Sequence, residues 1–308
     1  MVGAAEGRRG RLSHVRILVT GAGGQLGREL VGHLETSPTH DVVGLARDRL
    51  DVADRDAVLG AVGTVRPDAI VHTAAWTAVD ACEADPDRAL VVNALGSRHV
   101  AEGARRFGAH LVALSTDYVF DGTKADPYHE WDEPAPTSAY GRSKLAGEHE
   151  VLAGCPGATV ARTAWVCGAH GPNMVATVLR LAAERDQLAF VDDQRGSPTF
   201  TADLAPALVR LCIDRRPGVF HLTNAGAVSW YGSAGGGWVA AGAAPAGGRP
   251  AATADLDPPR PAPRPANSVL ANTSWAAAGL APLREFHQPL GELVDHLQAT
   301  RHSHVANM

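Results

Sequence analysis

A glycine-rich segment, Gly21-Ala-Gly-Gly24-Gln-Leu-Gly27, constrains the fold of this chain more than any other feature. It follows an apolar run at 16–20 that predicts a strand, and it opens an amphipathic stretch at 25–34 that predicts a helix. In this context Gly21 and Gly24 permit a tight turn close to a diphosphate, and Gly27 lets the helix pack on the strand. Because the first N–H groups of a helix favour an anion, the segment predicts a dinucleotide site.

The rest of the chain alternates short apolar runs with longer amphipathic stretches, which is typical of β–α units around a parallel sheet. The runs that predict strands are 16–20, 41–45, 69–73, 110–115, 158–162 and 218–222. The stretches that predict helices are 25–34, 54–63, 85–107, 138–152, 174–184, 201–212 and 283–297. We therefore expect an α/β protein, with a Rossmann-type doubly wound parallel sheet and a smaller C-terminal substrate lobe.

The same alternation suggests where the domains divide. We expect residues 1–14, rich in Arg and Gly, to be a disordered lead-in, and residues 15–165 to form the dinucleotide-binding domain. Residues 196–225 are predicted to return to that domain, while 166–195 and 226–308 form the substrate-binding lobe. Within the lobe, 232–265 is dominated by Gly, Ala and Pro, which weaken helices, so we expect a loosely ordered excursion there.

Composition excludes several classes of partner. A net charge of −5 over 308 residues gives no broad positive field, so no nucleic-acid partner is expected. The chain has no run of eighteen apolar residues and no signal-peptide pattern at its start, so no membrane partner is expected. Its four cysteines lie far apart, which predicts free thiols in a reducing, cytoplasmic compartment. We assign no metal ligands, and none to His302 and His304 near the end of the chain.

Tyr140-Gly-Arg-Ser-Lys144 lies in the stretch predicted to be helical, so Tyr140 and Lys144 share one helix face. A phenol with an ordinary pKa of about 10 is a poor partner for proton transfer at neutral pH, and a nearby ammonium favours its ionised form. The pair therefore predicts ketone reduction, with Tyr140 as proton donor and Lys144 beside it. Thr116 follows the strand at 110–115 and can complete the hydrogen bonding of the carbonyl oxygen.

Several segments occur in an order typical of one family. They are TGAGGQLG, AAWTAVDACE, STDYVFDG, AYGRSKLAGE, RTAWV and DDQRGSPT. With them the chain resembles the extended short-chain dehydrogenases/reductases and, among these, the dTDP-4-dehydrorhamnose reductases. The resemblance covers residues 15–225 and returns at 264–270. It implies an NAD(P)H-dependent reduction of dTDP-4-dehydro-L-rhamnose at the C4 ketone, giving dTDP-L-rhamnose.

The resemblance also implies roles for individual positions. Gly24, Gln25 and Leu26 would contact the cofactor phosphates, Asp51 and Val52 the adenosine, and Ala75, Trp76 and Thr77 the nicotinamide side. The sugar would contact Thr116, Asp117, Tyr118 and Trp165, the last through the face of its indole ring. Tyr118 and Trp165 have a second interpretation, as packing residues. Arg264 either binds the diphosphate or is one more charge in a proline-rich loop.

The choice of dinucleotide rests on Arg47. Where a carboxylate often binds the ribose 2′-hydroxyl, the sequence has Arg47, which suits the 2′-phosphate of NADPH. Asp48 follows directly, so an ordinary surface charge at Arg47, and use of NADH, both stay open.

Substrate identity is the least constrained part of this interpretation. After Ser229-Trp230-Tyr231 the family usually continues as an amphipathic helix, whereas this chain runs into glycines. A sister reductase of an antibiotic sugar, such as a streptose-type deoxyhexose, is the close alternative, and an epimerase is a further one. A non-catalytic dinucleotide-binding subunit is disfavoured because Tyr140 and Lys144 are both present. Bound Mg²⁺ and a homodimer are suggested by the resemblance alone.

Overall fold

The computed structural model describes residues 14–185, 187–233 and 248–306, and side chains up to residue 300. Six parallel strands form the central sheet. They are β1 (Val15–Thr20), β2 (His40–Leu45), β3 (Ala69–His72), β4 (His110–Thr116), β5 (Thr159–Thr163) and β10 (Gly218–His221). Their order is β10-β5-β4-β3-β1-β2, so β1 pairs with both β2 and β3 and the winding reverses there. The predicted α/β class and doubly wound sheet are confirmed.

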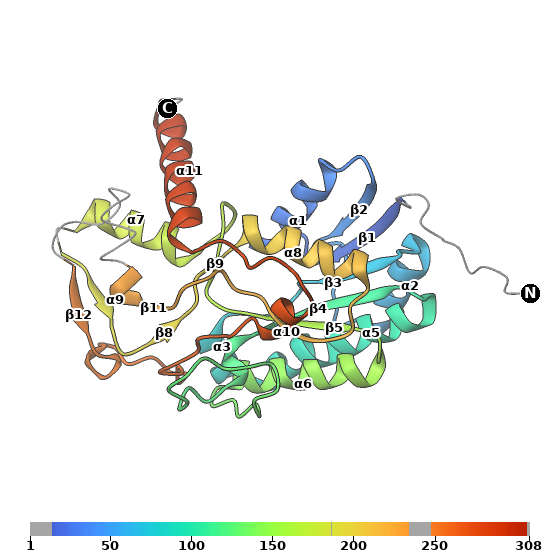
Figure 1. Ribbon diagram of the computed structural model, residues 1–308, viewed down its shortest axis with the longest axis horizontal. Helices are drawn as coiled ribbons and strands as arrows, with labels where there is room; N and C mark the ends of the chain where they lie inside the picture. Colours follow the sequence, from blue (N-terminus) through green and yellow to red (C-terminus); the bar gives the residue numbers. More distant parts are fainter. Residues whose placement is uncertain (1–13, 186, 234–247, 307–308) are drawn as a thin grey trace, which may run out of the picture.

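Helices cover both faces of this sheet, because its strands are apolar on both sides. Figure 1 shows α1 (Gln25–Glu35) and α8 (Thr201–Asp214) on one face, with α2 (Arg55–Val65), α5 (Gly96–Phe107) and α6 (Ala139–Gly154) on the other. Leu30 and Leu208 belong to the apolar core under the first pair, and Val62 and Val100 to the core under the second group. The reversal beside β1 leaves a crevice at the carboxyl ends of β1 and β3.

A separate apolar cluster lies beyond the sheet, on the left of Figure 1, and includes Val175, Leu179, Phe200, Leu290 and Val294. Its main helices are α7 (Met174–Glu184) and α11 (His287–Ala306). Short strands surround it: β7 (Ala189–Val191) pairs with β12 (Arg249–Ala251), β8 (Arg195–Gly196) with β11 (Val228–Ser229), and β6 (Val166–Cys167) with β9 (Thr199–Phe200). Short helices elsewhere in the chain include η2 (Asp117–Val119), α9 (Trp230–Ser233), η4 (Thr253–Asp255) and α10 (Thr273–Ala277).

The observed helices differ from those predicted from the sequence in three places. The predicted helix at 85–107 is α4 (Pro86–Leu90), a π turn η1 (Val91–Leu95) and α5, and a further helix, α3 (Val79–Ala84), was not predicted. The predicted closing helix at 283–297 was wrong at its start, since α11 begins at His287. Phe286 instead donates its N–H to the carbonyl oxygen of Ala225 at 3.0 Å, a pairing between distant segments that periodicity does not reveal.

Two predicted irregular segments are only partly described. The lead-in predicted at 1–14 lies outside the described residues except for His14. Of the excursion predicted at 232–265, residues 234–247 also lie outside them, but β12 is a regular strand paired with β7, so the prediction was wrong for that part. In the described chain, no helix combines the length and apolar character needed to cross a membrane.

Candidate active site

The glycine-rich turn connects β1 to α1 at the crevice. Gly21 has a φ of +72°, and a Cβ there would lie 2.6 Å from the Ala74 nitrogen. A Cβ at Gly27 would overlap the carbonyl oxygen of Gly21 and lie 2.7 Å from the Cα of Ala22. The turn is therefore tight enough to admit only glycine at these two positions, and main chain rather than side chains faces the crevice.

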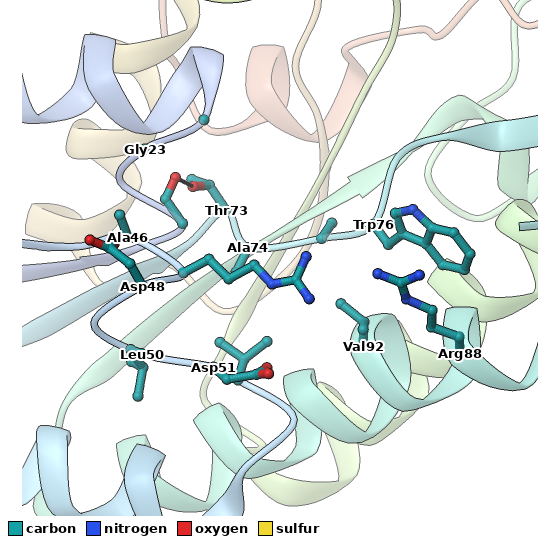
Figure 2. A pocket seen from close by; sticks show the side chains of 15 residues that line it. Gly23, Ala46, Asp48, Leu50, Asp51, Thr73, Ala74, Trp76, Arg88 and Val92 are labelled. Atoms are coloured by element: carbon teal, nitrogen blue, oxygen red, sulfur yellow. Dashed lines mark hydrogen bonds between the residues drawn. The ribbon is translucent and has the colours of Figure 1, made fainter. Parts of the chain in front are cut away.

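A cavity of about 420 Å³ opens from this turn along the ends of β2 and β3. Figure 2 shows its lining side chains converging from separate segments of the chain. The predicted cofactor residues that line it are Gly21, Gly24, Arg47, Asp51, Val52, Ala75 and Trp76. This shape fits an extended dinucleotide, with the glycine turn at the phosphates and Asp51 and Trp76 farther along.

The predicted cofactor residues Gln25, Leu26 and Thr77 do not line the cavity. The Gln25 side chain donates to the carbonyl oxygen of Val166 at 3.0 Å and accepts from the N–H of Gly168 at 2.9 Å. It therefore joins α1 to β6 and the residue that follows it. Leu26 is buried in the core under α1, and Thr77 is exposed outside the cavity lining. For Gln25 and Leu26, contact with phosphate stays a prediction that only their main-chain N–H groups can fulfil.

Arg88 is a lining residue that the sequence did not single out. It comes from α4, and its guanidinium carbon lies 4.5 Å from the ring centroid of Trp76 (Figure 2). No local motif marks this position, because the contact depends on how α4 packs beside the end of β3.

The predicted catalytic pair lies on α6. Ser138 caps this helix by accepting from the N–H of Gly141 at 3.1 Å, and Tyr140 and Lys144 follow one turn apart. Both side chains are buried. Tyr118 packs edge-on against Tyr140, with ring centroids 5.7 Å apart.

Burial dominates the electrostatics of this pair. The ammonium of Lys144 donates to the carbonyl oxygen of Leu114 at 2.7 Å. Burial raises the pKa of Tyr140 above its ordinary value, and hydrogen bonding with Thr116 acts in the opposite direction. Burial also lowers the pKa of Lys144 to about 8, opposed by Glu148. Burial dominates the pKa of Tyr140, which keeps its proton, and the effect of the Lys144 ammonium on the ionised phenol stays a prediction.

Asn93 links Trp76, in the cavity lining, to α6, and the sequence did not single it out. Its side-chain oxygen accepts from the N–H of Trp76 at 2.8 Å, and its amide nitrogen donates to the hydroxyl of Ser143 at 2.9 Å. It lies fully buried in the π turn η1, a feature often found at functional sites. The irregular helix there is the signal, but it is visible only in three dimensions.

The residues predicted to contact substrate follow β4 directly. The Thr116 hydroxyl donates to the Asp117 carboxylate at 2.9 Å and accepts from the N–H of Tyr118 at 3.2 Å. Asp117 is 2% exposed, and burial raises its pKa to about 6. Burial also raises the pKa of Tyr118 to about 12. Thr116 therefore lies between the acidic end of β4 and the phenol of Tyr140.

Trp165 and Arg264 have partners within the protein. The Trp165 backbone has a φ of +46°, and its indole stacks on Trp230, with ring centroids 3.6 Å apart. One face of Trp165 is therefore covered by α9. The Arg264 guanidinium binds both carboxylate oxygens of Asp80, at 2.7 and 2.9 Å, which favours the interpretation as a structural charge. In the described part of the chain, no group of three or more His, Cys, Asp or Glu side chains is placed to hold a metal ion.

Comparison with known proteins decides the family. The model of the RmlD substrate binding domain matches residues 15–299. The chain belongs to the RmlD family. It is 46% identical to a dTDP-4-dehydrorhamnose reductase of Streptomyces griseus, covering 90% of this chain and 92% of that protein.

Two other relatives of this RmlD-family chain bear on substrate and cofactor. A probable dTDP-4,6-dihydroxy-2-methyloxan-3-one 4-ketoreductase of Streptomyces antibioticus is 44% identical, covering 94% of this chain and 97% of that protein. A solved structure of dTDP-4-dehydrorhamnose reductase from Bacillus anthracis, in complex with NADP, has a TM-score of 0.85 and 34% identity. That similarity covers 93% of this chain and 99% of the other. The resemblance inferred from the sequence motifs is therefore confirmed.

Proposed function

We propose that this protein reduces the C4 ketone of dTDP-4-dehydro-L-rhamnose to give dTDP-L-rhamnose, with NADPH as the reductant. The observation that carries the proposal is the position of Tyr140 and Lys144. They are buried one turn apart on α6, and Tyr140 is hydrogen-bonded with Thr116. Tyr140 also shares an apolar cluster with Trp76, which lines the cavity that begins at the glycine turn. A relative named for this reaction is 46% identical over 90% of this chain.

The cavity residues fit a nicotinamide dinucleotide. The main chain at Gly21 and Gly24, with the start of α1, would hold the diphosphate, and Arg47 would meet a 2′-phosphate. The B. anthracis relative was solved with NADP, which supports this choice, while NADH stays an alternative. When bound, the dinucleotide supplies the hydride.

The chain's own residues would handle the proton. Tyr140 keeps its proton in the buried site, so it can donate that proton to the ketone oxygen as hydride reaches the carbon. Thr116 would hold the same oxygen by a hydrogen bond. Lys144 would hold the nicotinamide ribose and offset the charge left on the Tyr140 oxygen, which then recovers a proton from solvent. The ketone would thereby become an alcohol.

The sugar of the substrate would bind between the end of β4 and the substrate-binding lobe predicted from the sequence. Asp117 and Tyr118 would contact the sugar. Trp165 would reach it through the edge of its indole, because Trp230 stacks on the ring and Gly196 packs against it. We keep the division predicted from the sequence, in which 15–165 and 196–225 bind the dinucleotide while 166–195 and 226–308 bind the sugar. A homodimer also stays a prediction, and Mg²⁺ has no support among the described residues.

We also propose a cytoplasmic location. All four cysteines are free and buried, which fits a reducing compartment and a supply of reduced dinucleotide.

A sister reaction is the second candidate. The S. antibioticus relative is named as a 4-ketoreductase of a different deoxysugar and is 44% identical, close to the value for the S. griseus protein. Both candidates use the same catalytic pair and differ in the sugar that the second lobe accepts.

The test is NADPH oxidation by the purified protein, with dTDP-4-dehydro-L-rhamnose freshly made by the upstream enzymes and the product identified by mass and NMR. We expect rapid oxidation and dTDP-L-rhamnose. Tyr140→Phe is the control: it should bind NADPH within a few-fold of the parent and lose nearly all turnover, because only the proton donor is removed. Oxidation with another dTDP-4-keto sugar alone would favour the sister reaction, and full activity of Tyr140→Phe would exclude the proposed mechanism.

A further inference from the structure

Glu148 is a buried carboxylate that the proposed reaction does not use directly. It follows Tyr140 and Lys144 at the next turn of α6, so the three side chains lie along one helix face. All three are less than a tenth exposed. A carboxylate in such a place is costly unless it is paired, so its retention calls for a physical reason.

Two neighbouring strands hold Glu148 in place. Arg162 donates to both carboxylate oxygens, from Nε to Oε1 at 2.9 Å and from a terminal nitrogen to Oε2 at 2.7 Å. Ser115 donates its hydroxyl to Oε1 at 2.5 Å. Ser115 on β4 and Arg162 on β5 are directly paired in the sheet register. Glu148 is therefore fixed to the carboxyl end of β4, one residue before Thr116.

Lys144 is attached to the same end of β4. Its ammonium donates to the carbonyl oxygen of Leu114, the residue before Ser115. Three consecutive residues of β4 therefore bind three side chains of α6. Leu114 binds Lys144, Ser115 binds Glu148, and Thr116 is hydrogen-bonded with Tyr140. The register between α6 and β4 is set by these contacts, and a change at Glu148 would be felt at Lys144.

Among the described residues, the charged and titratable groups around Lys144 include side chains of α6, β3 and β5. On α6, the Glu148 carboxylate raises the pKa of Lys144 against the larger effect of burial. On β3, His72 faces the same space, and burial together with the charge of Lys144 lowers the pKa of His72 to about 3. His72 is therefore neutral near pH 7. On β5, Arg162 adds a positive charge that Glu148 already neutralises.

We propose that Glu148 is a positioning residue: bound by Ser115 and Arg162, it fixes α6 against the end of β4 and holds a negative charge one helical turn from Lys144 during the reduction. The inference rests on the proposed function, since it acts through Lys144. It makes a specific claim beyond fold stability: Glu148 sets the pH range in which Lys144 works.

The test compares pH profiles of kcat in the parent, Glu148→Gln and a matched control. Glu148→Gln keeps the size of the side chain and removes its charge. The control is Glu102→Gln, which breaks another two-point ion pair, with Arg55 at 2.6 and 2.8 Å, on a different helix. We expect Glu148→Gln to move the alkaline limb of the kcat profile to lower pH by about one unit. At pH 8 this lowers kcat about five-fold, and at pH 6 it changes kcat little. Glu148→Asp should recover most of the shift, and Glu102→Gln should show none.

Unpaired Arg162 is a hazard for folding, so a double variant, Glu148→Gln with Arg162→Gln, is measured as well. It removes both buried charges together and leaves two amides that can bond each other. The proposal predicts a lowered alkaline limb here too. A parental pH profile in either folded variant would overturn it.

A measurement that needs no substrate distinguishes failure of the proposed reaction from failure of the role proposed for Glu148. Titration of the Lys144 amine by NMR in the parent and Glu148→Gln proteins should give a lower pKa in the variant, whichever ketone the enzyme reduces. An unchanged Lys144 titration would reject the role of Glu148, whereas a lowered pKa in a protein inactive on every dTDP-4-keto sugar would reject only the reaction.

Discussion

The guanidinium of Arg88 lies over the indole of Trp76, 4.5 Å from the ring centroid, and both residues line the cavity that begins at the glycine turn. Trp76 follows β3 and Arg88 belongs to α4, so this contact joins two sides of the cavity. The stacked pair fixes the indole on the side where the nicotinamide is predicted to bind.

Arg88→Ala should therefore weaken dinucleotide binding. A cation–π contact contributes about 0.5–1 kcal/mol at an exposed site, so we expect the Kd for NADPH to rise about two- to five-fold. Fluorescence titration measures it. Arg66→Ala is the matched control, because the Arg66 guanidinium lies 4.8 Å from the Phe107 ring centroid outside the cavity lining. Equal effects of the two substitutions would contradict a local role for Arg88.

Arg47→Ala should change the choice of dinucleotide. A hydrogen bond to a charged group is worth about 1.5–3 kcal/mol, so the Kd for NADPH should rise about ten- to a hundred-fold while that for NADH stays within about two-fold. Arg49→Ala, two residues along the same exposed loop and outside the cavity lining, is the control. Parallel weakening of both cofactors by Arg47→Ala would mean that it does not contact the 2′-phosphate.

Gly27→Ala should destabilise the protein and impair dinucleotide binding. Its methyl group would overlap the carbonyl oxygen of Gly21 and push apart the turn and α1. Overpacking of this kind costs about 1–3 kcal/mol in the free energy of unfolding. Gly32→Ala on the same helix has open space around its Cβ and should stabilise by about 0.5–1 kcal/mol. Urea denaturation of both variants checks the signs, and a neutral Gly27→Ala would refute the steric argument.

Asp117→Asn should raise stability more at neutral than at acidic pH. Burial raises the pKa of Asp117 from 3.8 to about 6, so the folded state holds the proton more tightly than the unfolded state. Its contribution is fully present below about pH 4 and is lost as pH rises through about 6. The loss amounts to about 3 kcal/mol, and the asparagine variant avoids it. We expect the difference in free energy of unfolding between variant and parent to grow by that order between pH 4 and pH 7.

Asp121→Asn is the control, because its effect on the free energy of unfolding should depend on pH in the opposite direction. Hydrogen bonds from the main chain of Thr123 and the Tyr128 hydroxyl lower the pKa of Asp121, so its contribution is present above the unfolded pKa and lost toward acid. Its replacement should cost stability at pH 7 and little at low pH. Urea denaturation at several pH values checks both aspartates. A pH-independent difference for Asp117→Asn would show that its carboxyl group does not titrate differently on folding.

Much of the framework was predictable from local sequence. The strand, glycine turn and helix at 16–34 appear as predicted, and Tyr140 and Lys144 share a face of α6. The turn needs glycine for steric reasons confined to a few residues, and a spacing of four places two side chains together in any helix. The closing helix was misplaced because the pairing of Phe286 with Ala225 spans 61 residues, and no window of sequence contains it.

The sequence by itself determined the order of strands and helices, the glycine turn and the spacing of the catalytic pair, since each depends on neighbours along the chain. Only the tertiary structure decided the environment of that pair. Ser115, Glu148 and Arg162 meet because β4, α6 and β5 pack together, and burial in this packing raises the pKa of Tyr140 and lowers that of Lys144. Desolvation and charge pairing depend on all the atoms around a group, and most of those atoms come from distant parts of the chain.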